Sequence, residues 1–293
     1  MALSDLVSLL EPLHQDKEDG FYASAVSGVS LLRCQEAHGR NPIIYEPSLI
    51  FIAQGKKVGY LGDRVIEYNP GHYLVQTLPL PFECETYASQ DKPLLGIAVS
   101  IDLTVLAELV HTSLPEYGIP SDHNSSPKPM DSVAMTEGMQ EAVSRLVRAL
   151  HDPLDAHVMG QARVREVVFE ALKGQQGPAL KALILHQGNY SRVIRVLSEL
   201  QQKIDEGITV EALAVRANMS VSNFHKHFKE VTRCSPLQYL KRLRLIKARL
   251  LLSHDDLNVG QTARAVGYKS INQFSRDYKS YFGTSPKQDV RLE

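Results

Sequence analysis

The sequence contains little cysteine and no long hydrophobic segment. Its 293 residues include three cysteines, Cys34, Cys84 and Cys234, which are too few and too scattered for a disulfide framework or a paired-cysteine zinc site. No run of 18 apolar residues occurs, so the sequence predicts no membrane span. The first segment also lacks the basic and apolar parts of a secretory signal. We therefore expect a cytoplasmic protein with buried, reduced thiols.

Charge is divided unevenly along the chain. Residues 190–293 hold 18 Lys and Arg against 10 Asp and Glu, a net of +8. Residues 1–189 hold 14 against 23, a net of −9, and the whole-chain net of −1 hides this division. A basic block indicates a polyanionic partner. A solvated basic surface is the alternative.

The acidic part has the pattern of short β-strands. Segments rich in β-branched and aromatic residues follow one another, separated by turn formers such as Gly55 and the Asn-Pro-Gly at 69–71. This spacing predicts an antiparallel sandwich or a small barrel. The predicted strands are residues 26–33, 48–54, 57–60, 64–68, 72–76, 83–87 and 94–100.

Helices are predicted on both sides of these strands. Residues 1–20 fit a short amphipathic helix and a polar turn, and residues 115–131, dense in Pro, Ser and Asp, fit a loop. Apolar residues at helical spacing predict helices at 133–150 and 155–173. These two helices either cover the β-structure or contribute to a dimer contact. The domain boundary is predicted near 180–190.

Beyond residue 191 the whole chain has helical periodicity, and several helix starts are legible. Residues 235–238 and 285–288 both read Ser-Pro-x-Gln, which places Ser at the N-cap, Pro at the first helical position and Gln three residues after the cap. Asn258 and Gln261 repeat the pairing of cap and third residue. The predicted helices are residues 191–205, 210–217, 221–232, 236–253, 259–266, 271–282 and 286–291.

Two segments 50 residues apart share one pattern. Residues 220–229 read SVSNFHKHFK and residues 270–279 read SINQFSRDYK. In each, a cap serine is followed by two aromatic residues four positions apart, with a basic residue between them. The aromatic pair predicts a buried helix face, and polar residues occupy the opposite face. Since each segment follows a short helix and a tight turn, we predict helix-turn-helix units at about 210–232 and 259–282. A helical hairpin bundle with no DNA role is the alternative.

Longer stretches carry a family resemblance. The stretches are LAVRANMSVSNFHKHFK (213–229), SPLQYLKRLRL (235–245) and AVGYKSINQFSRDYKSYFGTSP (265–286). They resemble the DNA-binding region of AraC/XylS-type transcription regulators. YEPSLIFIAQG (45–55) and VFEALKGQQGPAL (168–180) resemble the branch of that family with an AraC-type N-terminal domain. The resemblance therefore spans nearly the whole chain.

The resemblance implies an α+β chain with two domains. Residues 1–180 would form an antiparallel, cupin-like β-barrel with flanking helices for sensing or dimerisation, 181–190 a linker, and 191–293 an all-α DNA-binding domain with the two helix-turn-helix units. It implies a sequence-specific regulator, an activator, with no enzymatic activity and no cofactor. The implied partners are duplex DNA, RNA polymerase, an unidentified small-molecule effector in the barrel, and a second copy of the chain.

The resemblance also implies a set of base-reading residues. The third and sixth helices would enter successive major-groove segments about 34 Å apart. Arg276 suits guanine, Asn272 or Gln273 suits adenine, and Ile271 suits a thymine methyl group. Lys226 stands where many relatives carry Arg and lacks the planar fork of Arg. The residues carried over by position are Ser222, Asn223, His225, Lys226, Ile271, Asn272, Gln273 and Arg276.

The helix predicted at 236–253 would separate the two units. Its apolar residues are expected to pack against both units, which would make it a rigid spacer. Three basic residues near the units are expected to touch phosphate or solvent, namely Lys229, Arg242 and Arg244. The apolar residues are Leu237, Leu240, Leu243, Ile246 and Leu250.

Three alternative functions can be weighed against the sequence. A DNA-repair methyltransferase joined to this DNA-binding block needs a four-cysteine zinc cluster, which three scattered cysteines cannot form. A cupin enzyme with a helical tail needs metal ligands. His72 stands alone in its strand, because residues 73–76 hold no second histidine, and we therefore predict no metal site. A barrel that only dimerises, without a ligand, stays open as an alternative.

Overall fold

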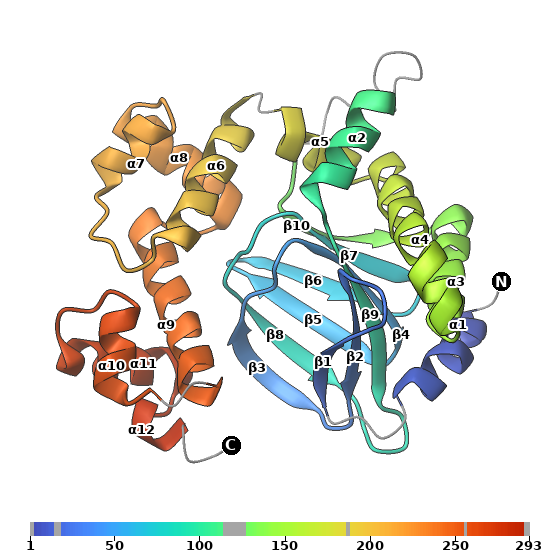
Figure 1. Ribbon diagram of the computed structural model, residues 1–293. Coiled ribbons are helices and arrows are strands. Elements are labelled where there is room, and N and C mark those ends of the chain that lie inside the picture. The colour runs from blue at the N-terminus through green and yellow to red at the C-terminus, as the bar shows by residue number, and fades with distance from the viewer. Residues whose placement is uncertain (1–2, 15–18, 114–126, 186–187, 255–256, 290–293) are drawn as a thin grey trace.

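The computed structural model describes most of the chain. Strands and helices α1–α5 form one body, and helices α6–α12 lie beside it (Figure 1). No helix in the described part of the chain combines the length and the apolar character that crossing a bilayer requires. The described residues are 3–14, 19–113, 127–185, 188–254 and 257–289.

Ten strands are described between residues 20 and 134, and every pair of hydrogen-bonded neighbours is antiparallel. They are β1 (Gly20–Ala23), β2 (Val29–Cys34), β3 (His38–Ile43), β4 (Ser48–Gln54), β5 (Lys56–Leu61), β6 (Arg64–Tyr68), β7 (His72–Gln76), β8 (Phe82–Tyr87), β9 (Leu94–Ser100) and β10 (Met130–Ala134).

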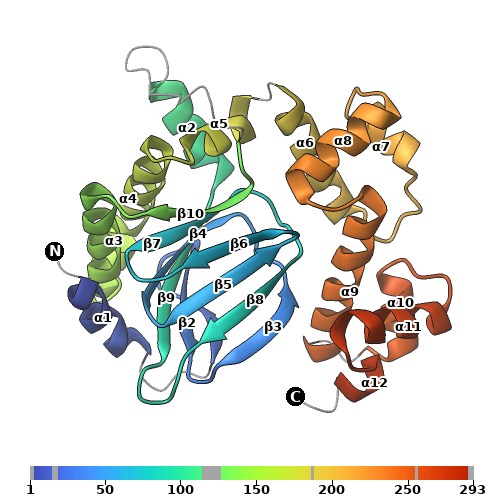
Figure 2. The same cartoon turned by 180° about the vertical axis from the view of Figure 1, so that it is seen from behind.

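The strands form two sheets. A six-stranded sheet has the order β1-β2-β9-β4-β7-β10, and a four-stranded sheet has the order β3-β8-β5-β6. Figure 2, seen from behind, shows the four-stranded sheet in front of the six-stranded one. The predicted antiparallel β-structure is therefore present. The pairing among the described strands is that of two open sheets and does not by itself define a closed barrel.

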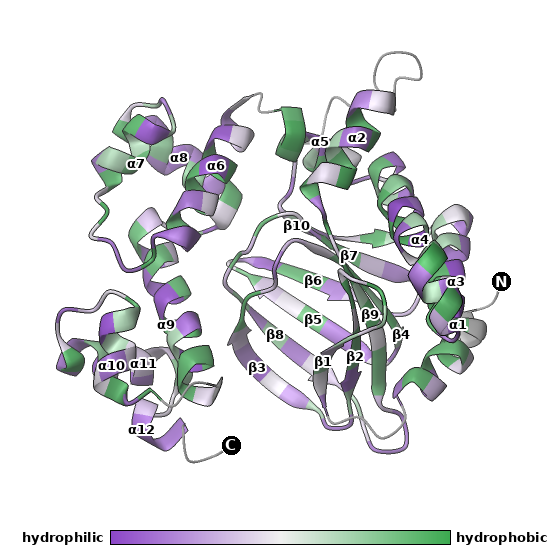
Figure 3. Ribbon diagram, viewed as in Figure 1, coloured by the Kyte–Doolittle hydropathy of each residue, from purple (hydrophilic) through white to green (hydrophobic). Residues whose placement is uncertain are grey.

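All seven predicted strands are present, but three strands were missed. β3 has the sequence HGRNPI and is mostly exposed, and Figure 3 shows it as largely hydrophilic. It is nevertheless a strand because it pairs with β8 at the edge of its sheet. β1 and β10 are also short edge strands. The loop predicted at 115–131 is wrong at its end, where Met130 begins β10 and pairs with Gln76; residues 115–126 lie outside the described residues.

The centre of the six-stranded sheet is buried on both faces. β4 reads SLIFIAQ, and all its residues but the last are buried, which matches an unbroken apolar run rather than an alternating one. One face meets the other sheet, and α1 contacts β4 and β9 on the opposite side. Phe51 stacks on Tyr73 across the β4–β7 pair, with ring centroids 5.2 Å apart.

Six helical segments accompany the sheets. The first predicted long helix starts later than expected, because Val133 and Ala134 belong to β10 and Thr136 caps α3 by accepting from the Met139 amide at 3.2 Å. The segments are α1 (Leu3–Leu10), the 3₁₀ turn η1 (Glu11–His14), α2 (Leu103–Ser113), α3 (Glu137–Ala149), α4 (Pro153–Lys173) and α5 (Gly177–Leu185).

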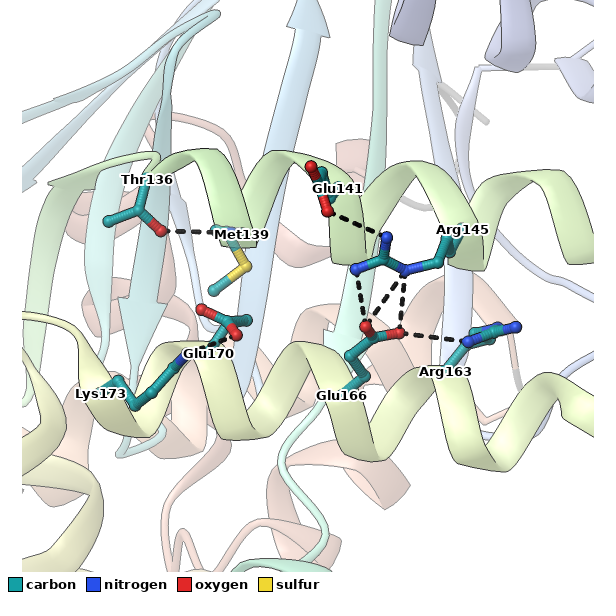
Figure 4. A network of polar contacts seen from close by, with 8 residues as sticks. All are labelled: Thr136, Met139, Glu141, Arg145, Arg163, Glu166, Glu170 and Lys173. Carbon is teal, nitrogen blue, oxygen red and sulfur yellow. Dashed lines mark hydrogen bonds and ion pairs between the residues drawn. The ribbon is translucent and has the colours of Figure 1, made fainter. Parts of the chain in front are cut away.

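Helices α3 and α4 lie side by side and are joined by a polar cluster. Arg145 of α3 donates to Glu166 of α4 at 2.7 Å and to Glu141 of its own helix at 3.0 Å, and Arg163 approaches the same Glu166 at 3.4 Å (Figure 4). The buried side of the pair consists of small and branched apolar residues such as Ala142 and Val167. This contact holds the two helices together within one chain.

The C-terminal part is helical throughout its described residues, and each of the seven predicted helices is present within a few residues of its predicted ends. They are α6 (Gly188–Gln202), α7 (Val210–Arg216), α8 (Val221–Thr232), α9 (Pro236–His254), α10 (Val259–Ala265), α11 (Ile271–Phe282) and α12 (Pro286–Asp289).

The helical part packs against the β-structure through α6, α8 and α9, and α11 contacts β3. The Tyr239 hydroxyl donates to the Pro79 carbonyl at 2.8 Å, and the hydroxyls of Thr77 and Tyr190 are 3.1 Å apart. At the β5–β6 turn, a Cβ atom on Gly62 would lie 2.9 Å from that of Arg233, the left-handed residue that ends α8. One buried cluster therefore runs from the sheets into α6, α7, α8 and the first half of α9.

Candidate nucleic-acid interface

The first helix-turn-helix unit is formed by α7 and α8. Ser220 caps α8, and its hydroxyl accepts from the Asn223 amide at 3.4 Å. Phe224 and Phe228 face inward with no exposed surface and have their ring centroids 5.4 Å apart. Phe228 also makes an edge contact with Tyr239 of α9. The aromatic pair thus fixes which side of α8 faces solvent.

The second unit, formed by α10 and α11, repeats this arrangement. Asn258 and Gln261 form a complete capping box at the start of α10, with both hydrogen bonds at 2.9 Å. Ser270 caps α11 through the Gln273 amide at 3.3 Å. Phe274 and Tyr278 are fully buried, with ring centroids 5.6 Å apart. The predicted caps and the predicted buried aromatic pair are both confirmed.

The turns of the two units differ in one residue. In each, the residue after the C-cap of the first helix is left-handed: Asn218 has φ +52° and Gly267 has φ +83°. The following amide bonds back five residues, from Met219 to Ala214 and from Tyr268 to Ala263, which is the Schellman closure of a helix end. The second turn then contains one extra residue, Lys269, before its cap serine.

All eight predicted base readers lie on exposed faces of α8 and α11. Seven of them lie away from the buried aromatic residues, as the repeat predicted, whereas Ile271 lies three residues before Phe274, near the aromatic side at the start of α11. Lys226 and Arg276 form no ion pair or hydrogen bond with the described residues, so both charges are available to a partner. Contact with bases stays a prediction. The exposed residues are Ser222, Asn223, His225, Lys226, Ile271, Asn272, Gln273 and Arg276.

Helix α9 connects the two units, but the residues that it buries differ from those predicted. Leu237 and Leu250 are wrong as packing residues, because their side chains are 60 % and 53 % exposed. Leu240, Leu243 and Ile246 are buried as expected. A helix flanked on several sides buries more than one stripe, and α9 also contacts α8, α10, α11 and α12. The additional buried residues are Tyr239, Leu245, Ala248 and Leu252.

Two basic residues of α9 have partners within the chain. Arg244 donates to the carbonyls of Ile204 at 2.7 Å and Glu206 at 3.0 Å, and burial lowers the pKa of its guanidinium. Arg244 is half-buried and its guanidinium is held by these two carbonyls, so it has a structural role beside its partial contact with solvent. Lys241 pairs with Asp277 of α11 at 2.7 Å.

A hollow of about 760 Å³ lies between α9, the segment that precedes α7, and the second unit. Arg264 and Lys269 are exposed beside Gln273 at its edge. Sequence reasoning omitted both basic residues, although the extra residue of the second turn is visible in the alignment of the two repeats. Their position next to a predicted base reader suits contact with the DNA backbone.

The cysteines and possible metal ligands contribute nothing to this face. All three cysteines are free and buried, and desolvation raises the pKa of the Cys234 thiol. Among the described residues, one group could offer three metal ligands, Asp19, Cys34 and His38, with ligand atoms within 4.8 Å of one another. Structural zinc sites use four such ligands. His72 lies outside this group.

Family models match both parts of the chain. The model described as the AraC-type transcriptional regulator N-terminus matches residues 25–179, and a helix-turn-helix domain model matches residues 213–291. The first match alone covers more than half of the chain. The chain therefore belongs to the AraC-type transcriptional regulators, which are regulators and not enzymes.

Curated relatives support the same family. The transcriptional activator RhaS of Salmonella paratyphi B is 35 % identical over 161 residues, which cover 54 % of this chain and 55 % of RhaS. The regulator GbdR of Pseudomonas aeruginosa (strain UCBPP-PA14) is 28 % identical over 148 residues, covering 47 % of this chain and 40 % of GbdR. The matches thus span about half the length of these relatives.

Solved structures show the same fold at low sequence identity. ToxT of Vibrio cholerae, solved with an unsaturated fatty acid bound, has a TM-score of 0.60 and 12 % identity, covering 94 % of this chain and 96 % of ToxT. An apo variant of ToxT gives a TM-score of 0.59 with 10 % identity, covering 94 % of this chain and 99 % of that chain. The arrangement of two sheets beside a helical region is therefore a known one.

Proposed function

We propose that this chain is a sequence-specific DNA-binding transcription regulator, an activator, controlled by a small-molecule effector in its N-terminal domain. One observation carries the proposal: two capped helix-turn-helix units present exposed, largely polar faces of α8 and α11 to solvent. The basic charge of residues 190–293 favours a duplex partner. The name of RhaS as an activator supports the direction of regulation.

The proposed base readers are the eight exposed residues of the two helices. Phosphate contacts position such a domain and base contacts give it sequence preference. Arg276 can donate two hydrogen bonds to guanine, and Asn272 or Gln273 can pair with adenine. In the first unit Ser222, His225 and Lys226 offer shorter or less directional contacts. We therefore assign the sharper base preference to the second unit.

The proposed division of labour follows the order of the chain. Residues 1–180 form the sensing domain, whose two sheets we interpret as a cupin-like barrel, 181–190 form the linker, and 191–293 form the DNA-binding domain. ToxT, which shares the fold, binds an unsaturated fatty acid, and this supports an effector role for the first domain. An activator also needs RNA polymerase as a partner. Because a regulator must reach chromosomal DNA, we propose that the protein acts in the cytoplasm.

We also propose that a second copy of the chain is a partner. Leu154, Val158 and Met159 on α4 are exposed hydrophobic residues, and Leu154 and Val158 stand one helical turn apart. They support a contact between copies, although α3 and α4 also cover the β-structure. Sedimentation of the full chain and of a Val158→Glu variant tests this contact: loss of a dimer in the variant supports it, and a wild-type monomer contradicts it.

The function is tested by salt-dependent binding of the full chain to duplex DNA. A preferred site is selected from random duplexes, and affinity is then measured between about 50 mM and 200 mM salt. We expect affinity to fall by about a hundredfold, because bound Lys and Arg release condensed counterions. We also expect the selected duplex to bind at least about a thousandfold more tightly than random duplex. Equal affinity for both duplexes would contradict the proposal.

A further inference from the structure

A buried lysine lies at the base of a cavity between the two parts of the chain. Lys57 of β5 pairs across the sheet with Tyr68 of β6 and Thr86 of β8. Its side chain is turned inward, and the residue is 7 % exposed. Its neighbour Lys56 is turned outward and pairs with Glu67 at 2.9 Å. The two adjacent lysines therefore have opposite environments.

The groups around the Lys57 ammonium are two phenols and a thiol, with no carboxylate among them. Its ammonium donates to the Tyr45 hydroxyl at 3.3 Å and lies 4.0 Å from the Cys84 sulfur. The Tyr68 hydroxyl is 3.4 Å from the same sulfur. Burial raises the pKa of Tyr45 and Tyr68, which keeps both phenols protonated at neutral pH. A buried charge without a counter-charge is costly, and Lys57 forms no ion pair with the described residues.

The cavity has the size and lining of a small-molecule site. It measures about 520 Å³, within the range of about 300–1,000 Å³ typical of ligand pockets. Its walls include Phe21, Ile43 and Ile44 from the β-structure and Ile246 and Leu250 from α9. Most ligand pockets combine such apolar walls with a few polar groups that fix orientation.

The charges that line the cavity are mostly positive. Arg33, Lys57 and Arg249 line it together with one carboxylate, Asp19. Asp19 is exposed and accepts from the Gln35 amide at 2.8 Å. Arg249 already has a partner, since it pairs with Asp289 at 3.1 Å. Lys57 is therefore the buried cation that a bound anion would neutralise.

We propose that this cavity binds a small organic acid, with its carboxylate on Lys57 and its apolar body between Phe21, Tyr45 and α9. The inference rests on the proposed function, because it assigns the effector a chemical class and a place. Helix α9 forms one wall and carries both helix-turn-helix units. An acid held there contacts the sensing domain and the DNA-binding domain at once, so its binding is expected to change affinity for DNA.

The experiment measures charge selectivity in the full-length chain. Two acids, 4-phenylbutyrate and octanoate, are compared by calorimetry with their uncharged alcohols, 4-phenylbutanol and octanol. We expect at least one acid to bind at least about tenfold more tightly than its alcohol, because only the acid neutralises a buried charge. A wild-type chain that prefers neither acid over its alcohol overturns the proposal.

Variants then locate the site. Lys57→Met keeps an unbranched side chain that is shorter only by the ammonium nitrogen, and it should abolish the preference for the acid. Lys56→Met, the adjacent control at a half-buried position that faces away from the cavity, should keep it. Leu250→Trp should block the cavity from α9, whereas Leu237→Trp, at a similarly exposed position of the same helix, should not. Thermal melts confirm that each variant is folded. If Lys57→Met does not fold, the test depends on the wild-type chain and on the two tryptophan variants. A preference for the acid that is retained in Leu250→Trp overturns the assigned site.

Binding to the selected duplex is measured in the same samples without and with the acid. If the chain prefers an acid over its alcohol but binds no duplex, the result contradicts the proposed function and supports this site. Duplex binding without acid preference contradicts this site alone. When both are present, the acid should change duplex affinity in the wild type and in Lys56→Met but not in Lys57→Met.

Discussion

The two helix-turn-helix units share one design but sit in different surroundings. Phe224 and Phe228 of the first unit belong to a core that continues into the sheets. Phe274 and Tyr278 of the second belong to a separate core of seven buried residues among those described. The same local sequence pattern thus gives one unit fused to the sensing domain and one that depends mainly on α9, α10 and its own helix.

This difference indicates how a signal would reach each unit. The first unit touches the sensing domain directly, through Arg233 at the end of α8 against Gly62, and the start of α9 adds the hydrogen bond of Tyr239 to Pro79. The second is connected through α9, with a further contact of α11 on β3. A change in the sensing domain therefore acts on the first unit by contact and on the second through the position of α9.

The largest expected effect separates the two cores. Phe224→Ala and Phe274→Ala should each cost about 3–5 kcal/mol, because each removes a fully buried ring. Phe224→Ala should lower the main unfolding transition, whereas Phe274→Ala should lower only a separate transition of the second unit. Calorimetry combined with hydrogen exchange distinguishes these outcomes. Equal shifts of a single transition in both variants would show that the two cores unfold as one.

The two turns provide the next test. Gly267→Ala should destabilise the second unit by about 1–3 kcal/mol, since alanine is strained at positive φ and its Cβ would lie 2.8 Å from the Asp205 backbone. Asn218→Gly is the matched change in the first unit and should alter stability by less than about 1 kcal/mol. Chemical denaturation of both variants provides the measurement. A wild-type midpoint for Gly267→Ala would mean that the turn relaxes freely.

The two units should also differ in how much one side chain contributes to the free energy of DNA binding. Arg276→Ala should cost about 1–3 kcal/mol on the selected duplex and relax the preference at one base pair, because a bidentate contact discriminates by about that much. Lys226→Ala should weaken binding with less selectivity, since lysine lacks the planar fork. Binding curves on matched and single-mismatch duplexes are combined with thermal melts. If Arg276→Ala weakens every duplex equally, the face of α11 is assigned wrongly.

The smallest effect concerns the direct contact of α9 with the sensing domain. Tyr239→Phe removes the hydrogen bond to Pro79 and should cost about 0.5–1.5 kcal/mol. It should also reduce the response of duplex affinity to 4-phenylbutyrate, while Tyr281→Phe, a partly buried tyrosine in the second unit, should not. Titrations of both variants with and without the acid check this. If the acid changes duplex affinity equally in Tyr239→Phe and in the wild type, the effect of the acid reaches the DNA-binding domain through other contacts of α9.

Features fixed by local sequence could be predicted, and features fixed by distant contacts could not. The caps at Ser220, Asn258 and Ser270 depend on residues three positions away, and the helix starts followed correctly. β3 is a strand only because β8 pairs with it. Arg244 looked like a free surface charge until the chain brought the carbonyls of Ile204 and Glu206 beside it.

The candidate sites divide in the same way. The exposed face of α11 follows from its aromatic spacing, so the position of Arg276 was predictable from the repeat. The inward turn of Lys57 was not, because two adjacent lysines in a strand look alike until the sheet pairing decides which one faces the core. The cavity itself needs residues from β1, β5 and α9, which lie far apart in the sequence.

The length of α9 has a consequence for the shape of the bound DNA. With 19 residues, the helix is about 28 Å long at about 1.5 Å per residue, while one turn of straight B-DNA is about 34 Å. A stiff connection shorter than the helical repeat favours a duplex that curves toward the protein. Bending a site of this size costs about 1–6 kcal/mol, and least at flexible pyrimidine–purine steps. We therefore expect such steps between the two half-sites, at base pairs that no side chain touches.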